Sequence, residues 1–291
     1  MLTILVPIDF TETSQKGLDY ALALAKADAA RIVLINLWNF PETHPSMSFI
    51  LHDVLRDQNE KSMHDLIEKI KRENQNKHLT LEGIVDVGNV VAIIKNTAKK
   101  FKADLIIMGT EGATGFKELF VGSNAAEVME NAPCPILAVP SEMNIEMPKK
   151  IVFATNLDKD DINRLKNLLD WFKPFESVFY IIHIGDPNYK DLNDFEDFIV
   201  QAKEKLLPKT FNYAYLAHRD IQQGIQDYIT TNKIDLLSMA IRKHSFFQQI
   251  LNRSLTKKMA YHTAIPLMAF PIFKKAEKQE EMAEKASEVA Y

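Results

Sequence analysis

Residues 103–140 read ADLIIMGTEGATGFKELFVGSNAAEVMENAPCPILAVP, and the pattern recurs without a gap at 234–271 as IDLLSMAIRKHSFFQQILNRSLTKKMAYHTAIPLMAFP. A second pair, TILVPIDFTETS at 3–14 and KIVFATNLDKDD at 150–161, is displaced by 147 residues rather than 131. We therefore expect the second copy to be shorter in its middle, around the helix after its second strand. An internal repeat of this length predicts two homologous domains in tandem.

Each copy alternates short apolar runs with longer segments of helical periodicity. In the first copy Thr11 is the expected N-cap of the first helix. Strictly alternating strands and helices predict right-handed crossovers and a parallel, doubly wound, Rossmann-like α/β sheet. The expected strands are 4–8, 31–37, 79–85, 104–109 and 135–140.

The composition is that of an ordinary globular chain. Its 291 residues are 46% hydrophobic and 25% charged, and the net charge of -4 argues against binding to nucleic acid or an anionic membrane. The N-terminus lacks the basic and apolar regions of a signal peptide, and no apolar run reaches the length of a membrane span. We expect a soluble cytoplasmic protein. Its one cysteine, Cys134, is expected to be an inert core thiol.

A glycine pattern follows the fourth expected strand. Gly109, Gly112 and Gly122 precede Ser123 and Asn124, which open a helix. Free backbone N–H groups at a helix start favour an anion, and glycines let it approach the main chain. The pattern therefore suggests a phosphate site. The alternative is that the glycines only form turns and that Ser123 or Asn124 is only an N-cap.

Two further residues end strands at the same edge of the expected sheet. Asp9 follows the first strand, where its carboxylate can accept from a ribose hydroxyl. Leu37 ends the second strand and could supply an apolar wall for a base. The alternative for Asp9 is that it only begins a turn.

The first copy resembles the universal stress protein (UspA-type) family. The residues that carry the likeness are ILVPIDFTETS, RIVLINL, VDVGNVVAIIKNTAKKFKADLIIMGTEG and FVGSNAAEVMENAPCPILAVP. The family motif G-x2-G-x9-G-[ST] is met by Gly109, Gly112, Gly122 and Ser123. The resemblance implies a five-stranded parallel sheet of the adenine nucleotide alpha hydrolase-like type, with ATP at the carboxyl ends of the strands.

By the same resemblance, Asp9 contacts ribose, Ile8 and Leu37 flank adenine, and Ser123 and Asn124 contact the β- and γ-phosphates. Any Mg²⁺ is expected on the phosphates, with no metal ligand from the protein. The implied nucleotide-binding residues are Pro7, Ile8, Asp9, Leu37, Met108, Gly109, Gly112, Gly122, Ser123 and Asn124.

Rapid ATP hydrolysis is not expected. The phosphate loop lacks the lysine of a Walker A sequence, and no G-x4-GK[ST] motif occurs in the chain. Glu111 and Glu118 lie nearby, but exposed loop glutamates are usually only solvated. We predict a binding protein with slow turnover at most.

The second copy loses the motif. Ala240, Lys243 and Arg253 replace the three glycines, and Asn156 replaces Asp9. The second domain is therefore not expected to bind ATP in the same way. Either long side chains fill a vestigial groove, or a new anion site has formed. The residues of that alternative site are Arg242, Lys243, His244, Arg253, Lys257 and Lys258.

The expected domains are residues 1–143 and 148–273, followed by a charged tail, 274–291. The fifth strands carry apolar residues on both faces, which favours pairing between exposed edges. Members of the resembled family commonly dimerise through this strand. We therefore predict a pseudo-twofold intramolecular dimer, with further self-association or a protein partner left open.

Three functional classes follow from these observations. The first is an ATP-binding stress or signalling protein whose nucleotide controls its conformation or a partner surface. The second is a non-catalytic interaction scaffold, and the third is a slow ATPase or a nucleotidyl-transferring enzyme.

Overall fold

The computed structural model describes residues 1–26, 29–38, 45–74, 76–110, 123–188, 190–206, 211–242 and 265–272, with side chains of 38, 45–52, 123–126 and 242 left out. Its strands are β1 Leu2–Pro7, β2 Ala30–Trp38, β3 Leu79–Val87, β4 Leu105–Thr110, β5 Ile136–Pro140, β6 Lys150–Ala154, β7 Val178–Gly185, β8 Asn212–Ala217, β9 Leu236–Arg242 and β10 Leu267–Ile272. Its α-helices are α1 Glu12–Ala25, α2 Pro45–Glu73, α3 Val90–Lys100, α4 Ser123–Asn131, α5 Asp161–Phe172, α6 Leu192–Lys205 and α7 Ile221–Asn232, and a 3-10 turn spans Lys173–Phe175.

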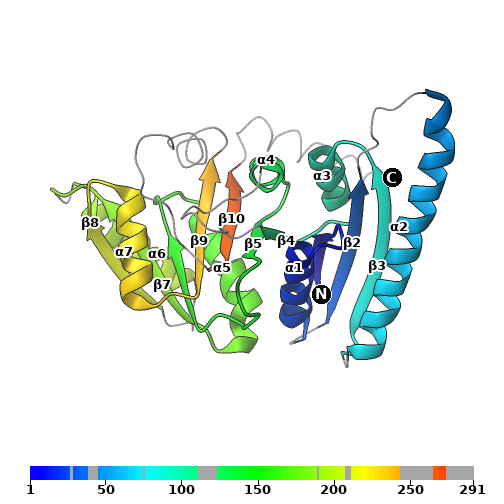
Figure 1. The fold of residues 1–291 in the computed structure, drawn as a ribbon. Coiled ribbons are helices and arrows are strands. Elements are labelled where there is room, and N and C mark those ends of the chain that lie inside the picture. The colour runs from blue at the N-terminus through cyan, green and yellow to red at the C-terminus, as the bar shows by residue number, and fades with distance from the viewer. Residues whose placement is uncertain are drawn as a thin grey trace, which may run out of the picture.

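The strands form one sheet in the order β3-β2-β1-β4-β5-β10-β9-β6-β7-β8 (Figure 1). Neighbouring strands run parallel within each half, which confirms the predicted doubly wound α/β class. The order is the same when it is read from either end, with the second copy replacing the first. The two halves are therefore related by an approximate twofold axis.

The halves join through the strands that end them. β5 and β10 pair in antiparallel fashion, with Leu267 opposite Ala138 and Met268 opposite Leu137. All four side chains are buried. Each strand thus covers an edge that would otherwise present unpaired backbone groups and apolar side chains to water.

The repeat extends to details of backbone conformation. Phe10 and Leu157, at aligned positions after the first strand of each copy, have φ angles of 64° and 63°. Lys102 and Lys233, aligned before β4 and β9, have φ angles of 50° and 53°. Residues other than glycine rarely adopt this left-handed region, so its recurrence at both aligned pairs is evidence for a duplicated backbone.

A carboxylate also recurs in an equivalent place. Asp104 accepts a hydrogen bond from the Thr3 backbone N–H at 2.8 Å, which connects the start of β4 to β1. Its counterpart Asp235 accepts from the backbone N–H of Lys150 at 2.8 Å, before β9. The same charged side chain therefore fixes the same strand pair in each half.

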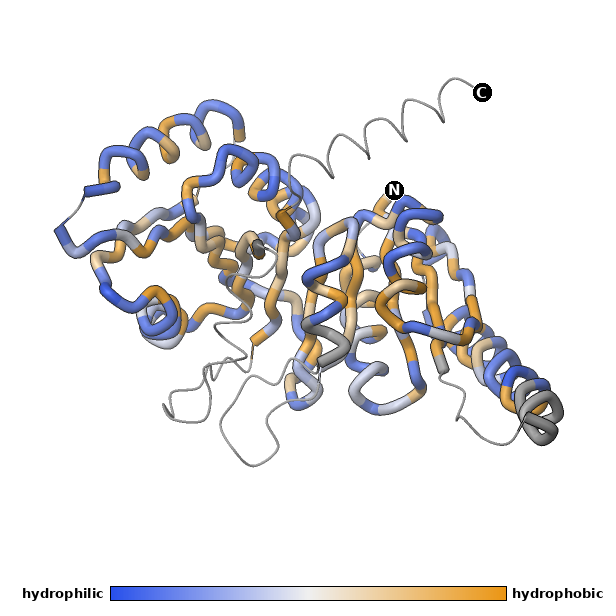
Figure 2. The backbone as a smooth tube through the Cα atoms, turned by 90° about the horizontal axis from the view of Figure 1, so that it is seen from above, coloured by the Kyte–Doolittle hydropathy of each residue, from blue (hydrophilic) through white to orange (hydrophobic). Residues whose placement is uncertain are grey.

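Helices cover both faces of the sheet. The face under α1, α2, α5 and α6 holds one core cluster, and the face under α3, α4 and α7 holds the other. Each cluster contains residues from both halves, so neither core stops at the β5–β10 junction. Hydrophobic residues follow the central strands and hydrophilic ones the outer sides of the helices (Figure 2).

The two copies differ most in the helix after their second strand. α2 has 29 residues, whereas its counterpart α6 has 14. This confirms the expectation that the second copy is shorter in its middle. The Thr11 cap is also confirmed, because its side chain accepts a hydrogen bond from the Ser14 backbone N–H at 3.2 Å.

Phe270 lies on β10, the second-half strand at the junction, and packs against two other aromatic side chains of that half. It is 3% exposed, meets Phe153 edge-on at 6.3 Å and stacks on Trp171 at 6.2 Å between ring centroids. We expect Phe270→Ala to lower the free energy of unfolding by about 3–5 kcal/mol, because the truncation leaves a cavity. Urea unfolding of the full chain measures the loss.

Val200→Ala is the matched control, because Val200 is 55% exposed on α6. Its effect should stay within about 0.5 kcal/mol. A loss below about 1 kcal/mol for Phe270→Ala would mean that this aromatic contact does not stabilise the junction.

Candidate functional site

The residues after β1 form a tight turn at the edge of the sheet. Ile8 is 2% exposed, and its backbone N–H donates to the carbonyl oxygen of Ile35 at 2.9 Å. Asp9 is exposed, and Phe10 follows in the left-handed conformation, which turns the chain into α1. The fold therefore brings an acidic side chain to the surface directly beyond a buried strand.

The Asp9 carboxylate is held by its own turn. Its Oδ1 accepts from the Thr11 hydroxyl at 2.5 Å and from the Thr11 backbone N–H at 3.1 Å. Partial burial acts to raise the pKa of Asp9, but hydrogen bonds from Thr11 and Ser14 outweigh it, so the pKa lies below its usual value. The carboxylate is therefore ionised at neutral pH.

Asp9 lies at the point where the strand order reverses. β1 sits between β2 and β4. From β1 the chain moves outward to β2 and β3, and it then returns to the other side of β1 to form β4 and β5. Open α/β sheets bind ligands in the crevice outside the carboxyl ends of the strands at such a point. The C-terminal residues of β2 and β4 lie at the same edge of the sheet. These include Leu37, Met108 and Gly109.

The candidate residues differ in their exposure and in the face of the sheet on which they pack. Pro7 is half-buried at the end of β1, and Met108 is 9% exposed. The Ile8 side chain packs in the core under α1 and α2, whereas Leu37 packs on the opposite face, under α3 and α4. The structure therefore does not bring the Ile8 and Leu37 side chains together as two walls of one slot. Ile8 contributes main chain to this edge.

The phosphate end of the candidate site is only partly described. Ser123 and Asn124 are the first two residues of α4, and only their backbone is described. Gly112 and Gly122 lie outside the described residues, as do Glu111 and Glu118. The predicted anion cradle in this loop stays a prediction.

Gly109 has a packing reason to be a glycine. A Cβ at Gly109 would overlap the carbonyl oxygen of Thr13, and a Cβ at Gly17 would lie 2.6 Å from the backbone nitrogen of Gly109. α1 therefore rests directly on the backbone of β4. The second copy has Arg164 and Ala240 at the aligned positions, and α5 makes no such approach to β9. The changed helix packing thus leaves room for Ala240 in the second copy, whether or not a phosphate is bound in the first.

Asn36 belongs to this site and was not predicted. It is 3% exposed on β2, and its Nδ2 donates to the carbonyl oxygen of Ile8 at 2.8 Å, directly before Asp9. Its Oδ1 is buried with no partner among the described atoms. The sequence did contain a clue, because Asn36 is the polar interruption in the apolar run RIVLINL.

The second copy builds a different structure at the aligned edge. Its Thr155, in the place of Ile8, donates to Asp161 Oδ2 at 2.6 Å, and Arg164 Nη1 lies 2.5 Å from Asp161 Oδ1. Arg164 also reaches Asp158 at 3.2 Å. Burial raises the pKa of Asp161 despite the opposing hydrogen bonds from Thr155 and Arg164.

Asn156, which replaces Asp9, is exposed beside this network. The basic residues of the alternative anion site lie outside the described residues, apart from the backbone of Arg242 at the end of β9. The unplaced residues are Lys243, His244, Arg253, Lys257 and Lys258.

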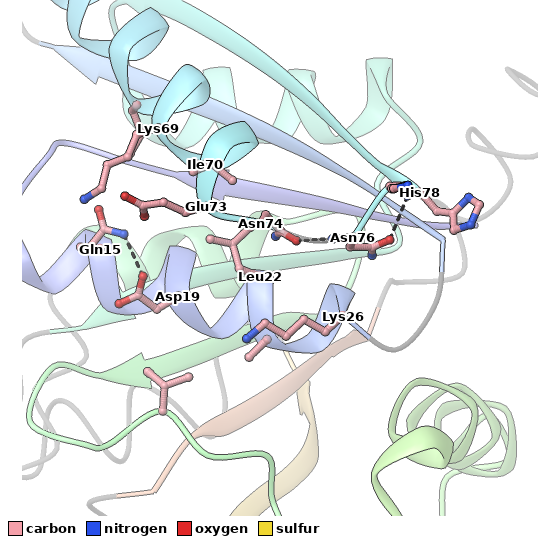
Figure 3. A pocket seen from close by; sticks show the side chains of 14 residues that line it. Gln15, Asp19, Leu22, Lys26, Lys69, Ile70, Glu73, Asn74, Asn76 and His78 are labelled. Carbon is pink, nitrogen blue, oxygen red and sulfur yellow. Dashed lines mark hydrogen bonds between the residues drawn. The ribbon is translucent and has the colours of Figure 1, made fainter.

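A large open groove lies elsewhere, along α1 and α2 (Figure 3). It has a volume of about 1110 Å³, with Leu22, Ile70 and Ile145 among its apolar residues and Asp19 and Lys69 among its charged ones. Its other end is the turn before β3. The groove therefore lies on the face of the sheet that α1 and α2 cover, and Asp9 is not among the residues that line it.

Other candidate chemistry is weak in the described residues. Cys134 is 8% exposed, and burial raises the pKa of its thiol to about 12, which fits the predicted inert core cysteine. No cluster of three metal-binding side chains occurs in the described ranges. No helix there is both long and apolar enough to cross a bilayer.

The family model described as Usp, universal stress protein family, matches residues 1–140. Universal stress protein YxiE of Bacillus subtilis (strain 168) is 30% identical over 143 residues, covering 47% of this chain and 97% of that protein. The chain belongs to the universal stress protein family. Universal stress protein MJ0531 of Methanocaldococcus jannaschii is 28% identical over 140 residues, which cover 47% of this chain and 80% of that protein.

A solved universal stress protein resembles the whole molecule. The crystal structure of a universal stress protein from Archaeoglobus fulgidus DSM 4304 aligns with 92% of this chain and 98% of its own, with a TM-score of 0.72 and 16% identity. At this identity the likeness concerns the fold alone. It extends over both halves, whereas the curated relatives match about half of the chain.

The contact between α1 and β4 gives a test that needs no nucleotide. We expect Gly109→Ala to lower the free energy of unfolding by about 2–3 kcal/mol, because the added methyl group meets rigid backbone. Urea unfolding of nucleotide-free protein measures it.

Gly224→Ala on α7 is the control, since the nearest atoms to its added Cβ are 3.3–3.4 Å away. Alanine also favours a helix over glycine, so the change should stay within about 1 kcal/mol. If both variants are as stable as the natural chain, α1 does not rest on β4 as described.

Proposed function

We propose that the first half of this universal stress protein binds ATP in the crevice at the carboxyl ends of β1, β2 and β4. The observation that carries the proposal is the position of Asp9. Its carboxylate is ionised, exposed and directly beyond the central strand at the reversal of strand order, where it can accept from a ligand hydroxyl. A ribose fits this acceptor. Leu37 and Met108 supply apolar surface beside it.

The phosphates would lie toward the start of α4. The glycine motif ends at Gly122, and α4 begins at the next residue, Ser123. A helix start presents free N–H groups and the positive end of the helix dipole, and both favour an anion. We propose backbone contacts from Gly112 and Gly122 with side-chain contacts from Ser123 and Asn124. Mg²⁺ would be held by the phosphates.

The second half is proposed not to bind ATP in this way. Asn156 lacks the charge of Asp9, and the Thr155–Asp161–Arg164 network lies directly beside it. We assign the domains to residues 1–143 and 148–273, with the charged tail 274–291 outside both. In this division one half carries the nucleotide and the other half completes the shared sheet.

The role proposed for the nucleotide is regulatory. Binding at the edge of β4 can bias α4, and α4 packs across the junction on β9 and β10. A nucleotide in the first half can therefore affect the second half or a surface formed by both. Stress response or signalling through a partner, in a cytoplasmic setting, is the function that we propose for this coupling.

Replacing Asp9 tests the ribose contact. We expect Asp9→Ala to weaken ATP binding at least about tenfold, because a hydrogen bond to a charged group contributes about 1.5–3 kcal/mol. The side chain is exposed, so the fold should persist. Isothermal titration calorimetry on the full chain gives the affinity and the number of sites.

Asn156→Ala in the second half is the matched control, and its affinity should stay within about twofold of the natural chain. One ATP per chain is expected. An effect of Asn156→Ala as large as that of Asp9→Ala would place the nucleotide in the wrong half and reject the assignment.

Turnover should be slow, since no Walker A lysine is present. We expect steady-state ATP hydrolysis below about 1 s⁻¹, the low end for dedicated enzymes. Phosphate release from purified protein measures it. A faster rate that Asp9→Ala abolishes would make the protein an ATPase.

The alternative is a scaffold whose first site stays empty. It shares the sheet and the apolar cores, which need no nucleotide. Purification without added nucleotide, followed by denaturation and identification of the released compounds, separates the two functions. Adenine nucleotide in the released fraction, and its loss from a Gly122→Val variant that remains folded, favours the binding protein.

A further inference from the structure

A cluster of a histidine, a carboxylate and a tyrosine lies in the second half, on β7, on β8 and directly before α6. His183 is 8% exposed on β7. Its Nδ1 lies 2.9 Å from the carbonyl oxygen of Thr155, and its Nε2 lies 2.8 Å from Asp191 Oδ2. Tyr215 on β8 donates its hydroxyl hydrogen to Asp191 Oδ1. His183, Asp191 and Tyr215 are called the His183 cluster below.

Both ring nitrogens of His183 face oxygen acceptors. A carbonyl oxygen and an ionised carboxylate have no hydrogen to donate, so each nitrogen must carry its own hydrogen for both contacts to be hydrogen bonds. A neutral imidazole has one N–H and can satisfy one of them. The geometry of the cluster is therefore complete only when the ring is doubly protonated and positively charged.

Asp191 remains ionised across the range in which histidine titrates. Hydrogen bonds from Tyr215 and from His183 hold the pKa of the Asp191 carboxyl at about 2. Its Oδ1 also accepts from the Asp186 backbone N–H at 3.1 Å. The partner of the ring is thus a fixed negative charge, whereas histidine is the residue type whose ordinary charge change falls between pH 5 and 8.

The chain is built to let these groups meet. A Cβ at Gly185 would overlap the ring and hydroxyl of Tyr215 and lie 2.6 Å from Asp191 Oδ1. The aligned residue in the first half is Trp38. A glycine at this position allows Tyr215 and Asp191 to close over the end of β7.

The cluster fastens one segment of chain to the sheet. Asp191 directly precedes α6, and the Tyr215 hydroxyl lies 3.0 Å from the carbonyl oxygen of Asp186. Phe195, in the first turn of α6, stacks on the His183 ring at 5.9 Å. Residues 186–188, residues 190–191 and the start of α6 thereby cover the carboxyl ends of β7 and β8, at the end of the sheet away from α2 (Figure 1).

Other charged groups surround the cluster. Directly after β6, the Thr155 hydroxyl donates to Asp161 at the start of α5, and Asp161 pairs with Arg164. In the covering segment, Lys190 lies 4.0 Å from Asp186. None of these carboxylates or cations bonds the imidazole directly, so His183 and Asp191 are the pair whose hydrogen bond depends on protonation.

We propose that the His183 cluster is a proton-dependent latch that holds Asp186, Asp191 and the first turn of α6 over the carboxyl edge of the second half. The imidazolium form closes the latch with both hydrogen bonds. Loss of one ring proton leaves one nitrogen facing an oxygen without a hydrogen, and the covering segment is released. Asn36 occupies the aligned position in the first half and does not titrate, so the switch belongs to the second half.

The test combines two measurements on the full chain at pH 6 and pH 8.5. Imidazole ¹⁵N NMR reports the protonation of His183, and amide hydrogen exchange, corrected for intrinsic rates, reports opening of residues 186–198. We expect a doubly protonated ring at pH 6 and its loss at pH 8.5. Exchange should accelerate about tenfold or more with that loss, since a hydrogen bond between charged groups disappears.

His183→Asn is the matched variant, because Asn36 donates to the aligned carbonyl in the first half. Its exchange over 186–198 should be independent of pH. Asp191→Asn keeps an acceptor without the charge and should remove the pH dependence as well, so the test survives if one variant fails to fold. Equal protection at both pH values, or an unchanged pH dependence in both variants, would overturn the latch.

Discussion

The antiparallel pair between β5 and β10 is the contact on which the rest of the molecule depends. Each half alone would end in a strand with apolar residues on both faces and unpaired backbone groups at its edge. Pairing the two strands satisfies both demands at once and makes both helical layers continuous across the junction. The site at Asp9 and the cluster at His183 are consequently carried by one framework.

Much of the fold could be predicted because its determinants are local and periodic. The strands and the Thr11 cap follow from short patterns, and the tandem arrangement follows from a repeat that the structure extends to matching left-handed residues. The site was less predictable. Asn36 and the α1–β4 contact at Gly109 depend on which segments meet across the sheet, which no local pattern contains.

Duplication has left two copies under different constraints. In the first, Gly17 and Gly109 let α1 touch β4, and an ionised Asp9 lies directly beyond β1. In the second, Arg164 in place of Gly17 pairs with buried Asp161 and half-buried Asp158, and the helix no longer approaches the strand. Once the helix position is no longer glycine and the helix does not approach the strand, the facing strand position need not be glycine either. The glycines of the first copy therefore reflect packing as well as any ligand.

Closing the inner edges leaves β3 and β8 as the two ends of the sheet. Among the described strands, any polymerisation by strand addition would have to start there, because each of the other eight has neighbours on both sides. β3 carries Glu82 and Asp86 along its nine residues, and such charges oppose the docking of a foreign strand. The chain pairs β5 with β10 internally, and the charges on β3 also protect that outer edge against strand-by-strand growth into a fibre.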